Sequence, residues 1–429
     1  MLRSKKPRSA PAKPVLLLIN ADTSKQPTPP ADRSKERLAD YTALREALPG
    51  EILDWQAIAA CWWASLLARV AGKGVALAAL AFSRHRRYRL FYCDSENNGL
   101  VLALLFKLAR VRRPLLTIGH WITPPKKSFL FKRLKVHSHI TTLFLHSSVQ
   151  CEKAVEELGI PAEKIQLLPY QVDTEFWKLE NAAVKATYPQ NAPYICTAGL
   201  EFRDYPTLIK AIHELEVDLH IGAASHWSKR RNTALTMNLP SNVTVRSYNY
   251  TELRDLYAGS RFVVVPLYEV DFQAGITVIL EAMAMGKPVV VSHSTGQTDM
   301  VKDRRKVTRG LNRPAAGRFV ELFGGDSLNA PTGFYVPAGN AEELRKAIRY
   351  LLENPERARE MGANSRRVAE NLISVEQFAT RVRRTVLENL GQPVSIESKI
   401  ENRRSKIQVG GLRSSDLRPL TLNLRSLIL

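Results

Sequence analysis

The chain has 429 residues, with 62 Lys and Arg against 41 Asp and Glu, and a formal net charge of +21. This length exceeds one typical domain, so we expect two hydrophobic cores. With 45% hydrophobic and 24% charged residues, the composition excludes a fibrous or wholly disordered protein. The four cysteines are widely spaced and form no C-x-x-C pair, which argues against a disulfide framework or structural zinc site and favours a reducing compartment.

The charge indicates a class of partner without naming it. Excess Lys and Arg serves the binding of nucleic acid, an anionic membrane surface or phosphorylated substrates. The sequence has no zinc-finger spacing, no RNP-like aromatic run and no G-x-x-x-x-G-K-[ST] loop. We therefore expect no nucleic acid partner, and we favour phosphate chemistry or a membrane surface.

Short apolar runs alternate with helical patterns along most of the chain. The first half contains the runs PVLLLIN, RLFYC, PLLTIG and ITTLFLH, and the second half contains YICTAG, VDLHIG, VTVRS, RFVVVP and PVVVS. Between them, residues 98–110, 148–158 and 206–215 have the three-to-four-residue spacing of helices. Such continuous apolar strands belong to parallel sheets covered on both faces, so the pattern predicts an α/β protein with two doubly wound domains.

Two apolar segments near the N-terminus need separate consideration. Val15–Ile19 follows basic residues, as in a signal peptide, but it is short and polar residues follow it, so we interpret it as the first strand. The Trp-rich segment 52–82 is interrupted by Arg69 and Lys73 and is too broken to span a membrane. Two interpretations of this segment remain open: a helix in the core of the first domain, or contact with an anionic membrane surface.

Residues 271–292, DFQAGITVILEAMAMGKPVVVS, carry the most informative chemistry. Gly275 permits close approach of a ligand and opens a helix predicted over Ile276–Met285, whose free N–H groups and dipole favour an anion such as a pyrophosphate. Glu281 lies about a turn and a half into this helix, where its carboxylate would accept hydroxyls of a ribose. Gly286 ends the helix.

This stretch resembles the nucleotide-sugar site of retaining glycosyltransferases of family 4, among the glycosyl transferases group 1, which have the GT-B fold. The family pattern is Glu-x7-Glu followed by Ala-Met-Ala-x-Gly-x-Pro-Val, and residues 281–289 match its second half. The first Glu falls at Gln273, where this chain departs from the pattern. Either Gln273 or, with a shifted loop, Asp271 then takes the place of the acid that contacts the donor sugar.

The resemblance covers most of residues 90–390. It includes HSS at 146–148, the run ELGIPAEKIQLLPYQVDTEFW, the run TAGLEFRDYPTLIKAI and the run TGFYVPAGNAEELRKAIRYLLENPERAREMGANSR. In the third of these, Arg203 takes the place of a Lys that binds the donor diphosphate in the family. The place of a second diphosphate-binding residue, an Arg, is shortened here to Gly199-Leu200-Glu201.

The resemblance implies two doubly wound Rossmann-like domains that face a cleft. Together with the composition, it gives the predicted divisions of the chain: a basic disordered tail at 1–13, an acceptor-side domain at 14–185, a nucleotide-sugar-binding domain at 186–375, a helix at 376–390 that crosses back to the first domain, and a disordered tail at 391–429. The join between the domains is expected within 181–193, and 302–331 is expected to be a long functional or mobile loop.

Site residues follow from the motif and from the ends of predicted strands. His120 follows the strand PLLTIG, and doubly wound sheets bind ligands at such ends. Asp94, Glu96 and Asn97 follow another strand, and Lys126 and Lys127 lie in a predicted loop. The predicted roles are catalysis by His120 and Arg203, acceptor-side contacts by Asp94, Glu96, Asn97, His120, Lys126 and Lys127, and donor binding by Gly199, Arg203, Gln273, Gly275, Ile276, Thr277 and Glu281.

The resemblance implies a retaining, hexosyltransferase-type enzyme that moves a sugar from a nucleotide diphosphate sugar to a glycan or lipid-linked acceptor. No D-x-D motif stands at a strand end, so we expect no metal and no cofactor besides the nucleotide sugar as co-substrate. A cytoplasmic enzyme, peripheral on the inner face of the membrane, fits the basic first domain. The alternatives are a sugar-nucleotide-binding protein without transfer activity and an epimerase of the same two-domain fold.

Overall fold

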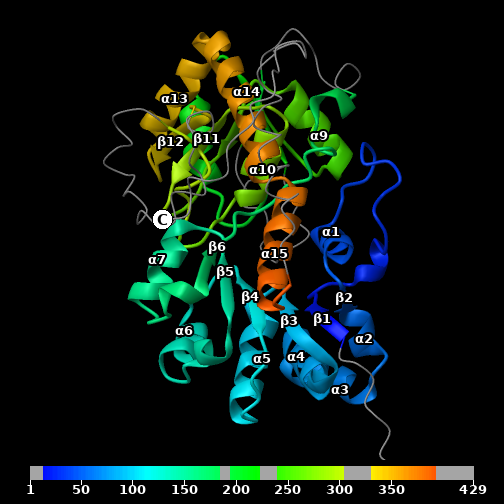
Figure 1. The fold of residues 1–429 in the computed structure, drawn as a ribbon. Coiled ribbons are helices and arrows are strands. Elements are labelled where there is room, and N and C mark those ends of the chain that lie inside the picture. The colour runs from blue at the N-terminus through cyan, green and yellow to red at the C-terminus, as the bar shows by residue number, and fades with distance from the viewer. Residues whose placement is uncertain (1–12, 184–193, 223–238, 304–329, 393–429) are drawn as a thin grey trace, which may run out of the picture.

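The computed structural model describes most of the chain (Figure 1), namely residues 13–183, 194–222, 239–303 and 330–392. Four features predicted from the sequence lie wholly or largely outside these residues: the tails at 1–13 and 391–429, the domain join at 181–193 and the loop at 302–331.

The first domain is built on a parallel sheet of six strands in the order β2-β1-β3-β4-β5-β6. In this sheet Leu17 lies opposite Ile52 on one side and Tyr92 on the other. The strand order reverses direction at β1 and β3, so the loops that follow these strands diverge and leave a crevice at the carboxyl edge. The strands are β1 (Lys13–Leu18), β2 (Gly50–Leu53), β3 (Tyr88–Cys93), β4 (Leu115–Gly119), β5 (Thr142–Leu145) and β6 (Ile165–Leu167).

Alternate side chains of this sheet enter two separate cores, as the two-residue period of a strand requires. Leu16 and Leu18 pack with α4 and α5, whereas Val15 and Leu17 pack with α1 and α15. The helices of the first domain are α1 (Asp40–Ala47), α2 (Trp55–Ala59), α3 (Trp62–Ala71), α4 (Lys73–Ser83), α5 (Glu96–Leu108), α6 (Pro125–Lys132) and α7 (Ser148–Glu156).

The second domain repeats this plan with strand order β12-β11-β10-β7-β8-β9, again parallel. Its direction reverses between β10 and β7, which brings the loops after these two strands together at one crevice. The strands are β7 (Tyr194–Ala198), β8 (Asp218–Gly222), β9 (Val243–Arg246), β10 (Val263–Val265), β11 (Val289–His293) and β12 (Gly333–Pro337).

Helices cover both faces of the second sheet. Val264 and Val290 pack with α8 and α13, while Val263 and Val265 share a core with α9, α10 and α14. The helices are α8 (Tyr205–Ile212), α9 (Tyr250–Gly259), α10 (Ile276–Ala284), α13 (Ala341–Glu353), α14 (Pro355–Leu372) and α15 (Val375–Asn389). Short 3-10 turns lie at Thr23–Lys25, His85–Arg87, Val136–His139, Ala162–Lys164 and Leu179–Asn181.

The last helix, α15, returns from the second domain to the first. It runs down beside α1 in Figure 1, and Phe378, Val382 and Val386 enter the core that contains Val15 and Leu17. Burial of such side chains contributes about 1.5–3 kcal/mol each. The return of the chain therefore ties the two domains together on the side away from α5.

The Trp-rich segment 52–82 contains the end of β2 and the three helices α2, α3 and α4. Residues of α4 such as Leu77 are fully buried, whereas Trp62 of α3 is 79% exposed. Among the described residues, none of the helices combines the length and the apolar character that a membrane crossing requires. The segment therefore divides between a buried helix, α4, and an exposed one, α3.

Candidate functional site between the two domains

The crevice of the second domain is built by the loops after β7 and β10. These loops pair through an antiparallel bridge between Arg203 and Leu267. The Asp204 amide donates to the Pro266 carbonyl at 3.1 Å, and the Tyr268 amide donates to the Phe202 carbonyl at 3.1 Å. Arg203 is thus held at the reversal point of the sheet, where ligands of doubly wound domains bind.

The Arg203 guanidinium lies between two glycines with left-handed backbone. Gly199 has a φ of 93° and Gly275 a φ of 76°. A Cβ at Gly199 would lie 2.5 Å from Arg203 Nη2, and a Cβ at Gly275 would lie 3.4 Å from Nη1. The absence of both side chains lets the guanidinium lie directly against the start of α10.

Arg203 is a buried cation that lacks a partner carboxylate. It is 6% exposed, and among the described residues it forms no ion pair. Its Nε donates to the Ala198 carbonyl at 2.9 Å and Nη1 donates to the Glu201 carbonyl at 2.8 Å, which leaves further N–H donors of the guanidinium for a ligand. Burial lowers the pKa of Arg203, so an anion placed beside it would be strongly favoured.

The N-terminus of α10 adds a second source of positive potential. Gly275 caps this helix in the left-handed conformation, and Gly286, with a φ of 66°, follows its end. The amides of Ile276 and Thr277 belong to the first turn, where no intrahelical carbonyl is available to them. Ile276 is buried and Thr277 is exposed, so the turn lies at the boundary between core and crevice.

Glu281 lies in the same helix and is 7% exposed. Its Oε2 accepts a hydrogen bond of 3.1 Å from the Tyr257 hydroxyl of α9. Burial raises the pKa of Glu281 to about 7, and Arg37, the Tyr257 hydroxyl and Arg203 offset part of this effect. Arg37 comes from the first domain and stacks over Tyr250 at 4.5 Å, so both domains contribute to the surroundings of this carboxylate.

Gln273 and Asp271, the two alternatives for the missing acid, have different surroundings. Gln273 is 5% exposed, and neither Nε2 nor Oε1 has a hydrogen-bond partner among the described residues. An amide buried without partners costs about 1–3 kcal/mol, which a ligand that supplies hydrogen bonds would recover. Asp271 is already bonded, because its Oδ2 accepts from Thr123 Oγ1 at 2.8 Å and from Lys153 Nζ at 3.1 Å.

Asp271 connects the second domain to the first. Besides Thr123 and Lys153, the Trp121 indole N–H donates to its Oδ1 at 3.0 Å. These three donors hold the pKa of Asp271 below its usual value against the opposing effect of burial. A second contact of this kind joins Asp299 to the start of α7, where the Ser148 amide donates at 2.8 Å and its hydroxyl at 2.6 Å.

On the first-domain side, His120 is held by hydrogen bonds to both ring nitrogens. Nε2 lies 3.0 Å from the Asp94 carbonyl, and Nδ1 lies 2.8 Å from the Tyr170 hydroxyl. A carbonyl only accepts, so Nε2 carries a proton, and in the neutral imidazole the Tyr170 hydroxyl donates to Nδ1. Tyr170 also stacks on the buried His146 with ring centroids 3.7 Å apart, which fixes the tyrosine.

Three charged residues support His120. Glu96 accepts from the His120 amide at 3.0 Å and pairs with Lys127 at 2.5 Å. Although burial opposes its ionisation, His120 and Lys127 lower the pKa of Glu96. Asp94 accepts from the Asn20 amide at 2.7 Å, and burial raises the pKa of Asp94 to about 7.

The region of Lys126 and Lys127 requires a correction. The sequence predicts a loop here, but both residues lie in the first turn of α6, which begins at Pro125 because proline favours the first turn of a helix. The Lys127 ammonium donates to Glu96 Oε1 and to the Trp121 carbonyl, whereas Lys126 is exposed. Asn97 is also exposed, so the structure brings neither Asn97 nor Lys126 into the hydrogen-bonded group around His120.

Three aromatic rings bring the two halves of the site together. The Trp121 and Phe272 rings meet across the domain boundary at a tilt of 32° with centroids 4.8 Å apart, and Phe272 meets Phe202 edge-on at 5.2 Å. Each ring is adjacent in sequence to a predicted site residue: Trp121 follows His120, Phe272 precedes Gln273 and Phe202 precedes Arg203. The backbone segments of these three residues are therefore held around one point of the crevice.

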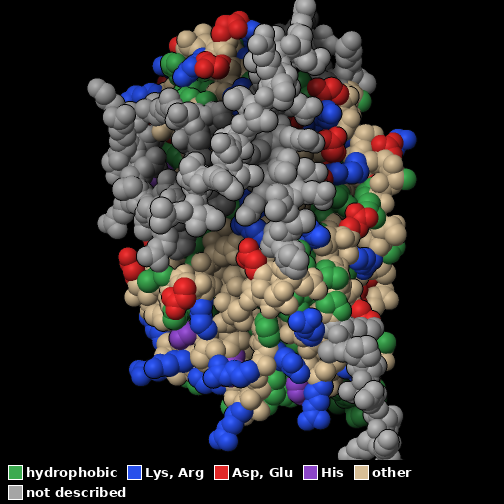
Figure 2. Space-filling model, in the orientation of Figure 1, with side chains coloured by type: hydrophobic (Ala, Val, Ile, Leu, Met, Phe, Trp, Pro, Cys, Tyr) green, Lys and Arg blue, Asp and Glu red, His purple; other side chains and the backbone are tan. Residues whose placement is uncertain are grey.

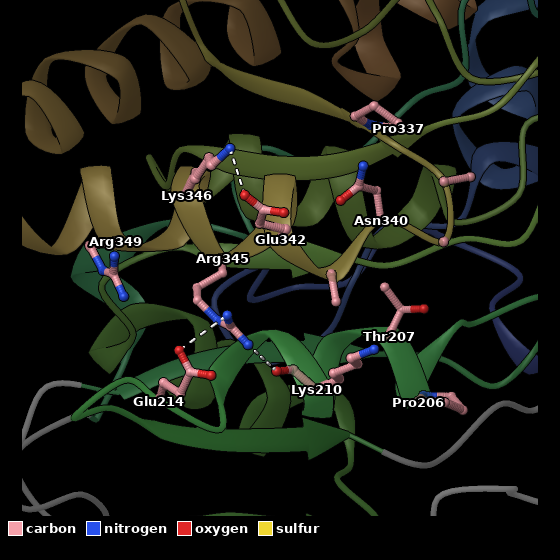
Figure 3. A pocket seen from close by; sticks show the side chains of 13 residues that line it. Pro206, Thr207, Lys210, Glu214, Pro337, Asn340, Glu342, Arg345, Lys346 and Arg349 are labelled. Carbon is pink, nitrogen blue, oxygen red and sulfur yellow. Dashed lines mark hydrogen bonds and ion pairs between the residues drawn. The ribbon is translucent and has the colours of Figure 1, made fainter.

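A separate groove lies in the second domain, away from these residues. It has a volume of about 1000 Å³ and lies between α8 and the start of α13 (Figure 3). Two of its cations form ion pairs inside the groove, Lys346 with Glu342 and Arg345 with Glu214. No predicted site residue lines this groove.

Comparison with known proteins identifies the second domain. Residues 202–354 match the model of the family described as Glycosyl transferases group 1. This part of the chain is therefore similar to the glycosyl transferases group 1 family. It contains Arg203, Gln273, Gly275, Ile276, Thr277 and Glu281, so the resemblance predicted from the sequence is confirmed for the region that carries the motif. No curated protein matches the chain in sequence.

Solved structures with the same architecture include glycosyltransferases. A glycosyltransferase from Rickettsia africae ESF-5 is 16% identical, with a TM-score of 0.60 over 88% of this chain and 99% of that one. HepE from Anabaena in complex with UDP-glucose is 17% identical, with a TM-score of 0.58 over 87% and 99%. Sucrose-phosphate synthase from Thermosynechococcus elongatus is 16% identical, with a TM-score of 0.59 over 88% and 98%. The predicted GT-B fold of two Rossmann-like domains is thereby confirmed.

Several residues around the site had no signal in the sequence. Tyr257 donates to Glu281 from within the second domain, the charge of Arg37 in the first domain lowers the pKa of Glu281, and Tyr170 of the first domain contacts His120. Gln150 donates to the His120 carbonyl at 2.8 Å. All four are far in sequence from the groups they contact, so only the folded chain reveals them.

Proposed function

We propose that the protein is a retaining glycosyltransferase of family 4 that transfers a hexose from a nucleotide diphosphate sugar. The observation that carries this proposal is the buried Arg203 guanidinium, which forms no ion pair with any residue that the structure describes and lies between two glycines at the start of α10. An arginine and a helix N-terminus that converge on one point form a site for a diphosphate. The UDP-glucose bound by Anabaena HepE, which has the same fold, supports a sugar nucleotide as the ligand.

The proposed site stabilises the leaving group. As the anomeric bond breaks, negative charge grows on the diphosphate beside Arg203 and the amides of Ile276 and Thr277. Donors that are already oriented toward such charge typically contribute about 10²–10³ in rate each. These protein groups take over the neutralisation of phosphate charge, so we propose that transfer requires no metal and no cofactor.

The remaining donor contacts follow from the direction of α10. Glu281 lies a turn and a half along the helix from the diphosphate and accepts the ribose hydroxyls when ionised. Gln273 lies just before the helix, and its unpartnered amide hydrogen-bonds hydroxyls of the transferred sugar. We propose Gln273 rather than Asp271 for this role, because Asp271 is engaged by Trp121 and Lys153.

The acceptor enters from the first domain. His120, whose amide donates to Glu96, precedes Trp121, and Gln273 follows Phe272, so the contact between these two rings brings the two chain segments together. We propose a glycan or lipid-linked acceptor there, on an enzyme that works in the cytoplasm at the inner face of the membrane. The contacts of Asp271 hold the domains closed around the reacting groups, which excludes water and limits hydrolysis of the donor.

A donor screen tests the proposal. Purified protein is incubated with UDP-, GDP- and ADP-sugars and a membrane extract, and released nucleoside diphosphate and glycosylated product are measured with and without EDTA. We expect release from one nucleotide class, unaffected by EDTA, with the anomeric configuration of the donor retained in the product. Binding without any release would identify a sugar-nucleotide-binding protein, and an isomerised sugar nucleotide would identify an epimerase; either result would overturn the proposal.

A further inference from the structure

Helix α3 exposes an apolar surface where a soluble helix usually exposes a polar one. Trp62 is 79% exposed, Leu66 is 56% exposed and Val70 is 82% exposed. Their spacing of four residues places them on one face of the helix. The opposite face packs against α4 through the fully buried Ala64, so packing holds α3 in place and sets which face points outward. We call Trp62, Leu66 and Val70 the apolar stripe.

A pocket of about 280 Å³ adjoins the apolar stripe between α2 and α3. Its walls are largely apolar, and the cations Arg69 and Lys73 are among the residues that line it. The Lys73 ammonium lies 3.6 Å from the centroid of the Trp55 ring, which orients the charge over an apolar surface. An acyl chain with an anionic headgroup has the matching chemistry. The pocket is lined by Trp55, Ile58, Ala59, Ser65, Ala68, Arg69 and Lys73.

The part of the first domain that contains the stripe is strongly basic. Between Trp55 and Cys151 the chain carries 15 Lys and Arg against two acidic residues, Asp94 and Glu96. Both acids are engaged inside the fold, by Asn20 and by His120 and Lys127. Figure 2 shows Lys and Arg side chains gathered at the lower end of the first domain. Each cation near an anionic bilayer contributes about a fivefold factor to partitioning.

We propose that α2, α3 and α4 dock the protein on an anionic lipid bilayer, with the apolar stripe inserted among the headgroups and Arg69 and Lys73 bound to lipid phosphates. Tryptophan and aliphatic side chains flanked by cations are the composition of interfacial helices. A second copy of this chain is a poorer occupant, because two basic faces would repel each other. The bilayer supplies both the apolar medium and the negative charge.

The docking face adjoins the acceptor side of the cleft. The Trp55 indole N–H donates to Asn20 Oδ1 at 3.1 Å, the Asn20 amide donates to Asp94 at 2.7 Å, and the Asp94 carbonyl accepts from His120 at 3.0 Å. The pocket is thus three hydrogen bonds away from His120. If the proposed glycosyl transfer holds, a lipid-linked acceptor reaches the cleft from the docked bilayer. This route for the acceptor rests on the proposed function, whereas the docking does not.

Vesicle flotation tests the docking. Full-length protein is mixed with vesicles of phosphatidylcholine alone or with phosphatidylglycerol, at low and high salt. We expect flotation only with the anionic vesicles, weakened by salt. Trp62→Ser/Leu66→Ser/Val70→Ser should abolish flotation, and Arg69→Gln/Lys73→Gln should weaken binding about 20-fold. The matched controls lie in the second domain: Tyr350→Ser, whose side chain is 43% exposed, and Arg357→Gln/Arg359→Gln; both should float as the wild type does.

Circular dichroism and thermal melting test whether each variant folds. The stripe variant should fold, because its three replaced residues are exposed. Flotation of the stripe variant equal to wild type, failure of the wild type to float, or conversion of a wild-type dimer to monomers by the stripe variant would each overturn the docking. Diphosphate release from sugar nucleotides is measured separately, with the membrane extract as acceptor and without added vesicles. Flotation without release would leave the docking standing while the proposed function fails, and release without flotation would do the reverse.

Discussion

Replacement of Glu281 by Gln should stabilise the protein while it weakens donor binding. The fold raises the pKa of this carboxyl from 4.5 to about 7 because it is buried. Between these values the folded chain keeps a proton that the unfolded chain has released, so the wild type loses stability as the pH rises through this range. A shift of this size corresponds to about 3 kcal/mol, the limit that the difference between Glu281→Gln and wild type should approach above pH 7.

The titration of Glu281 also sets how the affinity for the nucleotide sugar depends on pH. A ribose hydroxyl donates to the ionised carboxylate, and at pH 6 a group with a pKa of about 7 is ionised only about one-tenth of the time. UDP-glucose suits the measurement, because its diphosphate does not titrate near neutrality. Wild-type affinity should therefore fall about tenfold from pH 8 to pH 6, whereas the affinity of Glu281→Gln should be weak and independent of pH.

Two assays decide this prediction. Urea unfolding of wild type and Glu281→Gln at pH 5, 6, 7 and 8 gives the stability difference, and calorimetric titration with UDP-glucose gives the affinities. Glu353→Gln, at an exposed position of α13, is the matched control and should match the wild type in both. Equal stabilities of Glu281→Gln and wild type at every pH, with an affinity that does not change with pH, would refute the burial and the ribose role of Glu281.

Three further outcomes are expected. Gly275→Ala should cost about 1–3 kcal/mol in urea unfolding, because its φ is 76° and a Cβ would lie 2.8 Å from Val265 Cγ1; unchanged stability would contradict the left-handed cap. Gln273→Met should stabilise the free protein by about 1–3 kcal/mol and weaken UDP-glucose more than UDP in calorimetry; equal losses for both ligands would remove its sugar contact. Asp271→Asn should raise the radius of gyration in X-ray scattering and lower turnover, with Asp303→Asn as a second-domain control; no change in scattering would show that Asp271 does not hold the domains closed.

The sequence predicted the fold well where apolar runs are long. The runs over β1, β3, β4 and β7 are buried on both sides and read clearly as strands. β2 and β6 were missed because GEIL and IQL are short and contain polar residues, and they gain their place by pairing with neighbouring strands. The start of α6 was missed for a local reason, since two consecutive prolines suggest a loop although the second one opens a helix.

Some residues of the candidate site could also be predicted from the sequence, whereas the contacts of others appear only in the folded chain. Gln273, Gly275 and Glu281 lie in one continuous segment, so their relation could be derived from helix geometry alone. Arg203 came from the family resemblance, and its contact with both glycines emerges only when the loops after β7 and β10 pair. Contacts such as that of Tyr170 with His120 depend on the packing of distant segments, which leaves no local pattern in the sequence.

A crystal structure of the protein with an intact nucleotide sugar tests the central claim most directly. We predict that the diphosphate oxygens lie within hydrogen-bond distance of the Arg203 guanidinium and of the Ile276 and Thr277 amides, with the ribose hydroxyls on Glu281. A nucleotide bound outside the crevice, with Arg203 in contact only with the Ala198 and Glu201 carbonyls, would contradict the account.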